Sequence, residues 1–144
     1  MAKMIINGSN LLMGRLASFA ARKALEGEQV TIVNCKKVYV SGSPKGVLER
    51  YKRKFTLGTT LHGPFISRNP GFLMRRSIRG MLPWNRVRGR EAFRRVKCYP
   101  DVPEALKGKP TVAIEAKGIN KLPITRYITL GEVCARIGTK RDKK

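Results

Sequence analysis

The stretch that decides the fold is residues 4–33, which have the sequence MIINGSNLLMGRLASFAARKALEGEQVTIV. It begins with three apolar residues, Met4-Ile5-Ile6, and ends with Val30-Thr31-Ile32-Val33, and short runs of this kind are typical of buried strands. Between them, apolar residues recur at steps of three and four, the spacing of a helix with one buried face. Ser9 or Asn10 can cap this helix, and Gly27 can end it.

The next residues continue the pattern. Val38-Tyr39-Val40 predicts another strand, and the turn at 41–46 leads into a helix whose apolar face comprises Val47, Leu48, Tyr51 and Phe55. The order strand, helix, strand, strand, helix is typical of a layered α/β domain. A length of 144 residues fits a single domain over residues 1–144, because domains cluster at ~100 to 150 residues.

A basic helical region is expected at 69–97, after a loop at 56–69 that has no periodicity. Asn69-Pro70 predicts the start of its first helix, since Asn caps helices and Pro is tolerated at the first helical position. Pro83 is the expected end of that helix. The remaining predicted elements are a helix from Arg86 or Arg90 to Arg95, a strand at 96–99, an extended run at 111–115, a helix at 130–137 and a flexible basic tail at 138–144.

The charge of the chain is extreme and unevenly distributed. Lys and Arg number 31 against 9 Asp and Glu, a formal net charge of +22. Fifteen of the basic residues lie at 45–97, where the only acids are Glu49 and Glu91. From Arg68 to Arg95 every basic residue is Arg, whose planar fork can grip phosphate oxygens with two N–H groups. A polyanionic partner, and specifically a nucleic acid, is therefore expected.

Several other classes of protein are disfavoured. No apolar run approaches the ~20 residues of a membrane-spanning helix, and the first residues lack a signal-peptide core, so we expect a cytoplasmic protein with no membrane partner. Cys35, Cys98 and Cys134 lack the spacing of a zinc site and are odd in number, which predicts free core thiols and no metal. His62 has no orienting carboxylate or nucleophile near it in sequence, so no enzyme, catalytic residue, cofactor or small-molecule substrate is expected.

Two glycine-rich turns, at 7–10 and 41–46, leave an enzymatic alternative open. Each precedes a predicted helix, and helix N-termini bind phosphate. Neither matches a nucleotide fingerprint, because the interval from Gly42 to Gly46 is one residue too short and Val47 replaces the required Lys. The alternative is a nucleotide- or phosphate-binding enzyme that uses the turn at 41–46. A DNA-binding architectural protein is a second alternative, although no helix-turn-helix or zinc pattern favours it.

Trp84 allows two interpretations. Its ring could stack on a base or an arginine, or it could close the edge of the core. The apolar neighbours Met81 and Leu82 favour the core.

Three blocks near the centre of the chain resemble the signature region of the universal large-subunit ribosomal protein thirteen family: Arg79-Gly80-Met81-Leu82-Pro83, Arg88-Gly89-Arg90-Glu91-Ala92 and Val96-Lys97-Cys98-Tyr99. Residues 13–18, 30–34 and 40–42 resemble the same family in the same order. Leu130-Gly131-Glu132-Val133-Cys134 followed by Gly138 resembles the archaeal and eukaryotic branch, and the short C-terminus resembles the archaeal proteins. The similarity covers nearly the whole chain and is weakest at 107–124.

This resemblance implies a structural constituent of the large ribosomal subunit that binds ribosomal RNA, supports subunit assembly and contacts neighbouring large-subunit proteins. The implied fold is a three-layer α/β/α arrangement around a mostly parallel four-stranded sheet, with extra C-terminal helices. The RNA contacts carried over from the family are Arg15, Arg79, Arg86, Arg88, Arg90, Arg94 and Lys97. Charge and helical position alone add Lys45, Lys52, Lys54, Arg75 and Arg76. These twelve residues are called the candidate RNA contacts below.

Overall fold

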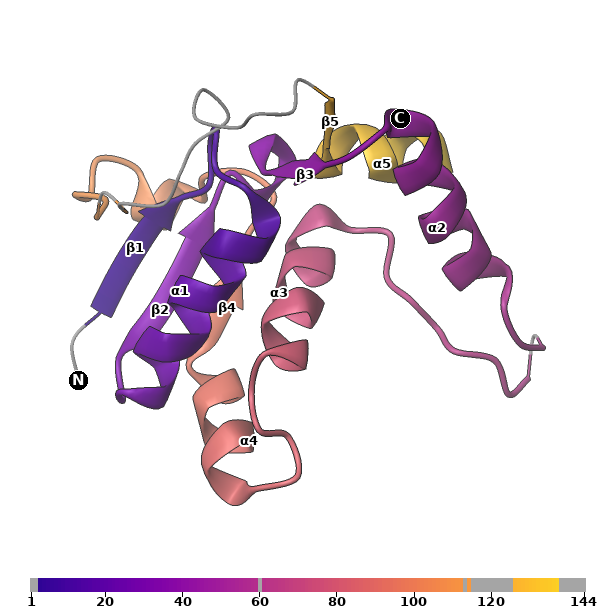
Figure 1. Ribbon diagram of the computed structural model, residues 1–144. Helices are drawn as coiled ribbons and strands as arrows, with labels where there is room; N and C mark the ends of the chain where they lie inside the picture. Colours follow the sequence, from indigo (N-terminus) through magenta and orange to yellow (C-terminus); the bar gives the residue numbers. More distant parts are fainter. Residues whose placement is uncertain (1–2, 60, 113, 115–125, 138–144) are drawn as a thin grey trace.

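The main sheet has three parallel strands, β1 (Lys3–Asn7), β2 (Gln29–Val33) and β4 (Val96–Cys98), in the order β1-β2-β4. The computed structural model that contains it describes residues 3–59, 61–112, 114 and 126–137 (Figure 1). In the register of the sheet, Met4 lies opposite Val30, and Val30 lies opposite Val96. Side chains alternate between the faces of a strand, so these apolar residues share one face.

Two helices cover this apolar face. The first, α1 (Met13–Leu25), connects β1 to β2, and α3 (Pro70–Gly80) packs beside it (Figure 1). The short helix α4 (Val87–Arg94) follows and leads directly into β4. Four buried alanines on α1 allow close packing, because an Ala side chain fills little space: Ala17, Ala20, Ala21 and Ala24.

The other face of the sheet lies against the segment that contains η2 (Glu104–Leu106), a single 3-10 turn. The predicted α/β class and the parallel sheet are confirmed. The sheet differs from the expectation in having three strands rather than four, because β3 (Tyr39–Ser41) pairs elsewhere. In the described part of the chain, η2 takes the place expected for a second layer of helices.

A second, smaller unit adjoins the main sheet. In it β3 pairs antiparallel with β5 (Tyr127–Thr129), and the rings of Tyr39 and Tyr127 meet edge to face, with their centroids 4.9 Å apart. The helices α2 (Pro44–Thr56) and α5 (Leu130–Ile137) pack together here, close to the turn η1 (Cys35–Lys37). The bounds of α5 are those predicted.

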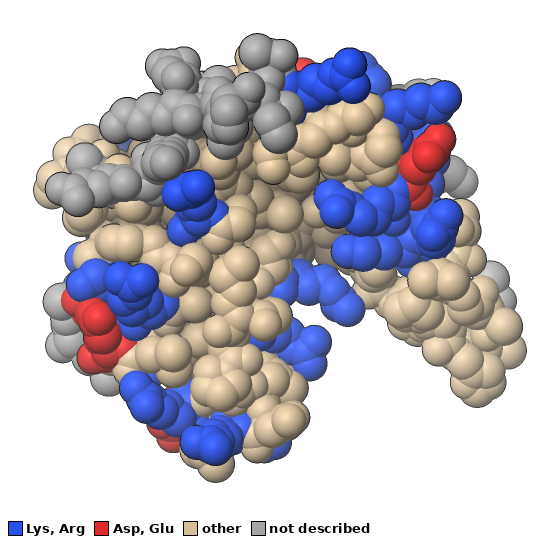
Figure 2. Space-filling model, viewed as in Figure 1, with Lys and Arg blue, Asp and Glu red and all other residues tan. Residues whose placement is uncertain are grey.

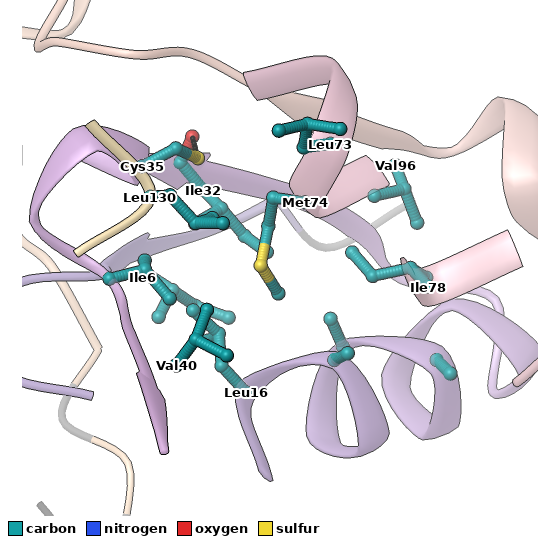
Figure 3. Close-up of a cluster of buried hydrophobic side chains, with 14 of the residues drawn as sticks. Ile6, Leu16, Ile32, Cys35, Val40, Leu73, Met74, Ile78, Val96 and Leu130 are labelled. Carbon is teal, nitrogen blue, oxygen red and sulfur yellow. Dashed lines mark hydrogen bonds between the residues drawn. The ribbon is translucent and has the colours of Figure 1, made fainter. Parts of the chain in front are cut away.

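One hydrophobic core joins the two units. It includes Ile6 and Ile32 from the sheet, Leu16 from α1 and Leu130 from α5, all fully buried. Met74 extends from α3 into the centre of this cluster (Figure 3). Because α3 contributes to this shared core, the residues on its outer face are held firmly in place.

The start of α1 differs from the prediction. The helix begins at Met13 instead of directly after Ser9 or Asn10, and neither residue caps it. Asn7 accepts a hydrogen bond from the Ser9 N–H at 3.0 Å and another from the Asn34 side chain at 3.1 Å. Asn10 has a left-handed backbone with φ of 63°. This side-chain turn competes with the helix and delays its start.

The other predicted boundaries agree with the structure more closely. Gly27 follows the end of α1 with φ of 100°, and Asn69 caps α3 as expected. The helix α3 ends at Gly80, three residues before Pro83. Val112, in the run expected at 111–115, forms an isolated parallel bridge with Ile6. The tail predicted at 138–144 lies outside the described residues, and so do residues 113 and 115–124 of the weakly matched segment at 107–124.

Candidate nucleic-acid interface

The position of α3 is set by close backbone contacts at its first turn. The Asn69 side chain accepts a hydrogen bond from the Gly71 N–H at 2.9 Å, which satisfies one of the free donors at the helix start. A Cβ atom on Gly71 would lie 2.9 Å from the carbonyl oxygen of Cys98. Glycine is therefore required for α3 to approach β4 this closely, and the arginines of α3 are fixed relative to the sheet.

The position of α4 depends on a second glycine. Gly89 is buried against the turn before the helix, and a Cβ atom here would collide with the carbonyl group of Pro83. The residues on either side of it, Arg88 and Arg90, are exposed. Gly89 thus allows α4 to pack against this turn, while the charged side chains of Arg88 and Arg90 lie in solvent.

Trp84 lies at the corner between α3 and α4 and is half-buried. Its ring meets Phe93 edge to face with a centroid distance of 5.2 Å, and the Arg79 guanidinium lies 4.2 Å from its centre. Arg90 Nε donates a hydrogen bond to the Trp84 carbonyl oxygen at 3.1 Å. Trp84 therefore closes the edge of the core and also stacks with an arginine, so both interpretations of this residue hold in part.

A notch of about 600 Å³ opens at this corner. Its lining includes Trp84 and three of the candidate RNA contacts, Arg76, Arg79 and Arg86. Three guanidinium groups around an aromatic ring are suited to phosphate oxygens and base faces.

Two other arginines of this region turn toward the protein. Arg75 donates from Nε to the Val96 carbonyl oxygen at 3.1 Å and from a terminal nitrogen to the Phe93 carbonyl oxygen at 3.4 Å. Its guanidinium also lies 4.2 Å from the centre of the Phe93 ring. Arg95, which was not a candidate, donates to the Ala24 carbonyl oxygen at 3.1 Å. Both residues connect secondary-structure elements, and α4 depends on them for its position.

The remaining candidates are largely free to meet a partner. Ten of the twelve are exposed, and only Arg75 and Arg79 are half-buried. Among the described residues, the ion pairs are those of Lys23 with Glu26 and Glu28 and of Lys36 with Asp101, so none of them involves a candidate. The hydrogen bond and the charge attraction between Lys23 and Glu26 are the main causes that raise the pKa of the Lys23 amine. Unneutralised cations on this scale repel one another, and an anionic partner would relieve the repulsion.

A hollow separates the body of the protein from an arm, which consists of α2 and the loop at 57–69. Figure 2 shows Lys and Arg side chains on both sides of this hollow. At the root of the arm, a recess of about 200 Å³ is lined by Lys54 of α2 and Arg76 of α3 together with Tyr51, Ile66, Leu73 and Ser77. Lys54 therefore shares a concave basic surface with Arg76 of α3, whereas Lys52 is exposed on α2 but does not line this recess.

The other candidates lie on separate surfaces. Arg94 and Lys97 line a groove of about 900 Å³ over the second face of the sheet. Arg15 is exposed on α1, and Lys45 is exposed at the start of α2. The structure therefore brings together Arg76, Arg79 and Arg86 at the notch, but it does not gather all twelve candidates into one patch.

Three further cations line that groove and were not among the candidates: Lys3, Arg95 and Lys109. Lys3 begins β1, two strands away from Lys97, and only the pairing of β1 and β4 on either side of β2 brings them to one face. No local pattern predicts this neighbourhood.

The glycine-rich turns offer few donors to a phosphate. The Gly42 N–H donates to the Arg126 carbonyl oxygen at 3.0 Å, and Pro44 at the start of α2 has no N–H. In the first turn, the Gly8 N–H donates to the Val33 carbonyl oxygen at 2.9 Å. A phosphate-binding loop instead directs several free N–H groups at its ligand, so the geometry disfavours the nucleotide-binding alternative.

Cys35, Cys98 and Cys134 form no disulfide with one another, and Cys35 and Cys134 are buried. Cys35 and Cys98 are adjacent in the fold, since Cys98 lies opposite Ile32 in the sheet and the Cys35 N–H donates to the Tyr99 carbonyl oxygen at 3.1 Å. A hydrogen bond with Cys35, together with burial, raises the pKa of the Cys98 thiol far above its ordinary value. Within the described residues, no group of three or more His, Cys, Asp or Glu is arranged to hold a metal ion.

Comparison with known proteins shows that the chain matches a known family. The family model described as Ribosomal protein L13 matches residues 2–105. The chain belongs to the ribosomal protein L13 family. This match confirms the family resemblance that was based on the signature blocks at 79–83, 88–92 and 96–99.

Curated members of the L13 family align with nearly the full chain. The relative from Archaeoglobus fulgidus is 39% identical over 93% of this chain and 86% of its own length. Those from Methanosarcina barkeri and Aeropyrum pernix are 40% and 38% identical, and they cover 94% and 96% of this chain and 98% and 91% of their own lengths. All three are named large ribosomal subunit protein uL13.

The L13 family comprises ribosomal proteins and not enzymes, which agrees with the absence of a catalytic constellation from the sequence. The three relatives named above are archaeal, which agrees with the resemblance of residues 130–138 to the archaeal and eukaryotic branch. In the part of the chain that the structure describes, no helix has the length and apolarity needed to span a membrane.

Proposed function

We propose that this protein is a component of the large ribosomal subunit in the cytoplasm, that it binds ribosomal RNA through its arginine-rich surfaces, and that it supports assembly of the subunit. Neighbouring large-subunit proteins are its further partners. The RNA contacts are the ten exposed candidates together with the half-buried Arg79, and the centre is the notch with Arg76, Arg79 and Arg86.

One observation carries this proposal: Lys and Arg side chains lie on both sides of the hollow, and none of the candidate RNA contacts has an ion-pair partner among the described residues. Folded RNA presents closely spaced phosphates and 2′-hydroxyl groups, which a rigid basic surface can recognise by shape. Lysines of α2 and arginines of α3 and α4 could then neutralise phosphates of more than one RNA segment. The binding would lower the repulsion between these segments, and this is how the protein would assist assembly.

Co-sedimentation tests the proposal. We expect the tagged full-length protein to sediment with large ribosomal subunits in a cell extract at low salt and to leave them only at high salt. Its presence in the soluble fraction alone at low salt would contradict the proposal. Sedimentation with an unrelated DNA in place of ribosomal RNA would favour the DNA-binding alternative.

A further inference from the structure

The outer part of the arm is unexpectedly apolar for so basic a protein. Leu57 is 56% exposed, Leu61 is 82% exposed and Phe65 is 78% exposed. These are three of the eight large hydrophobic side chains that are exposed among the described residues, and they fall within nine positions. Clustered exposed apolar side chains of this kind mark interaction sites.

The loop that carries these side chains is held by defined contacts. Gly58 has φ of 86°, and a Cβ atom on it would collide with the backbone of Gly63. The Gly63 N–H donates to the Thr59 carbonyl oxygen at 2.7 Å, and the His62 N–H donates to Thr59 Oγ1 at 3.1 Å. The loop is thus closed on itself near its middle, and its side chains Leu57, Leu61 and Phe65 are exposed.

The root of the loop is anchored to the basic arm. Arg68 lies 5.6 Å from the centre of the Phe55 ring, and Ile66 lies in the recess beside Leu73. The loop extends from the body of the protein in Figure 1, on the far side of the hollow from α3 and α4. A partner that enters the hollow would therefore meet this loop.

The charges around the loop indicate the chemistry of that partner. Lys52, Arg53 and Lys54 precede the loop, and no Asp or Glu occurs between Glu49 and Glu91. An apolar surface surrounded by cations alone is complementary to nucleic acid, in which phosphates surround bases with exposed faces. A protein partner would need an apolar patch with a purely acidic surround.

We infer that residues 57–59 and 61–66 belong to an RNA-inserting loop, in which Phe65 stacks on an unpaired base of large-subunit ribosomal RNA while Lys54 holds an adjacent phosphate. This inference rests on the proposed function and adds to it a specific residue and a class of ligand, the face of an unpaired base. It also gives the loop a role that phosphate binding alone does not require.

The affinity for transcribed large-subunit ribosomal RNA tests the inference. Phe65→Leu keeps an apolar side chain but removes the ring, and we expect it to raise Kd by about 5- to 150-fold, the effect of losing one base stack. Phe65→Trp keeps a stacking ring and should stay within about twofold of the unmodified protein. Neither change removes a phosphate contact, so the dependence of Kd on salt should keep its slope.

Phe72→Leu is the matched control, because Phe72 is 56% exposed but lies on α3 outside the loop. The affinity of the Phe72→Leu protein for the same ribosomal RNA should be unchanged. An unchanged Kd for Phe65→Leu, beside unmodified protein that binds tightly with a steep salt dependence, would overturn the inference and leave the proposed function intact. Unmodified protein that shows no salt-dependent binding would overturn both.

A photo-crosslinking residue at position 65, in protein incorporated into large subunits, separates RNA from protein as the partner. An adduct with ribosomal RNA supports the inference. An adduct with another ribosomal protein overturns it, and assigns the loop to a protein contact instead.

Discussion

Individual arginines in the basic region have two different roles. Arg75 donates to carbonyl groups of Val96 and Phe93 and covers the Phe93 ring, whereas Arg88 is exposed and has no ion pair among the described residues. The first therefore stabilises the fold, and the second is available to RNA. The two residues make a matched pair, because both changes to Ala remove the same charge.

Arg75→Ala is expected to lower the free energy of unfolding by about 1–3 kcal/mol, because it leaves two carbonyl groups without their donor. Thermal unfolding should show a Tm lower by several degrees. Arg88→Ala should leave Tm unchanged within error and weaken the affinity for ribosomal RNA. The assignment of roles is wrong if the two variants have equal Tm values.

The raised pKa of the Cys98 thiol gives a second test at the residue scale. A raised pKa lowers the fraction of reactive thiolate at any pH below it, so Cys98 should react with a disulfide reagent at pH 8 at least ~10-fold more slowly than free cysteine. Unfolding in guanidinium should expose all three thiols. A single fast-reacting thiol in the native protein, located at Cys98 by mass spectrometry, would contradict a raised pKa of the Cys98 thiol.

At the scale of elements, the arrangement of α4 depends on the absence of a side chain at Gly89. Gly89→Ala forces the helix away from the Pro83 carbonyl group and should lower the free energy of unfolding by about 1–3 kcal/mol. Since α4 also carries Arg88 and Arg90, the affinity for RNA should fall as well. Circular dichroism melts and RNA titrations measure the two effects.

Gly80→Ala is the control for this change. Gly80 lies in α3, and a Cβ atom there meets nothing within 4 Å. Ala favours helix over Gly, so this variant should be as stable as the unmodified protein or more stable by about 0.5–1 kcal/mol. A similar loss of stability in both variants would show that Gly89 has no special packing role.

The elements differ in how well the sequence predicts them. The helix at 130–137 and the strand at 30–33 were predicted well, because their apolar spacing is a local property. The pairing of β3 with β5 joins residues almost ninety positions apart, and nothing local specifies it. The start of α1 was misplaced because hydrogen bonds from Ser9 and Asn34 to the Asn7 side chain form a turn that competes with the helix.

The candidate site was predictable in composition but not in geometry. The run of arginines from Arg68 to Arg95 identifies a basic region, and helical spacing places its members on outer faces. The inward turn of Arg75 depends on the Val96 carbonyl group, a partner 21 residues away. The groove shared by Lys3 and Lys97 likewise depends on strand order, which the local sequence does not contain.

For the molecule as a whole, the net charge of +22 has two opposite consequences. Repulsion between like charges destabilises the free protein, and salt screens it, so the Tm of the free protein should rise as salt is added. The same screening weakens binding to RNA. Differential scanning calorimetry of the free protein at increasing salt should show this rise, and a Tm that falls with salt would contradict it.

The central claim is that the exposed arginines and lysines around the hollow neutralise phosphates of ribosomal RNA. The most direct test is the equilibrium affinity of the unmodified protein for transcribed large-subunit ribosomal RNA at increasing salt. If about 6–10 phosphates are neutralised, Kd should rise by about 10³- to 10⁵-fold between about 50 and 200 mM salt. A Kd that stays constant over this range would contradict the claim.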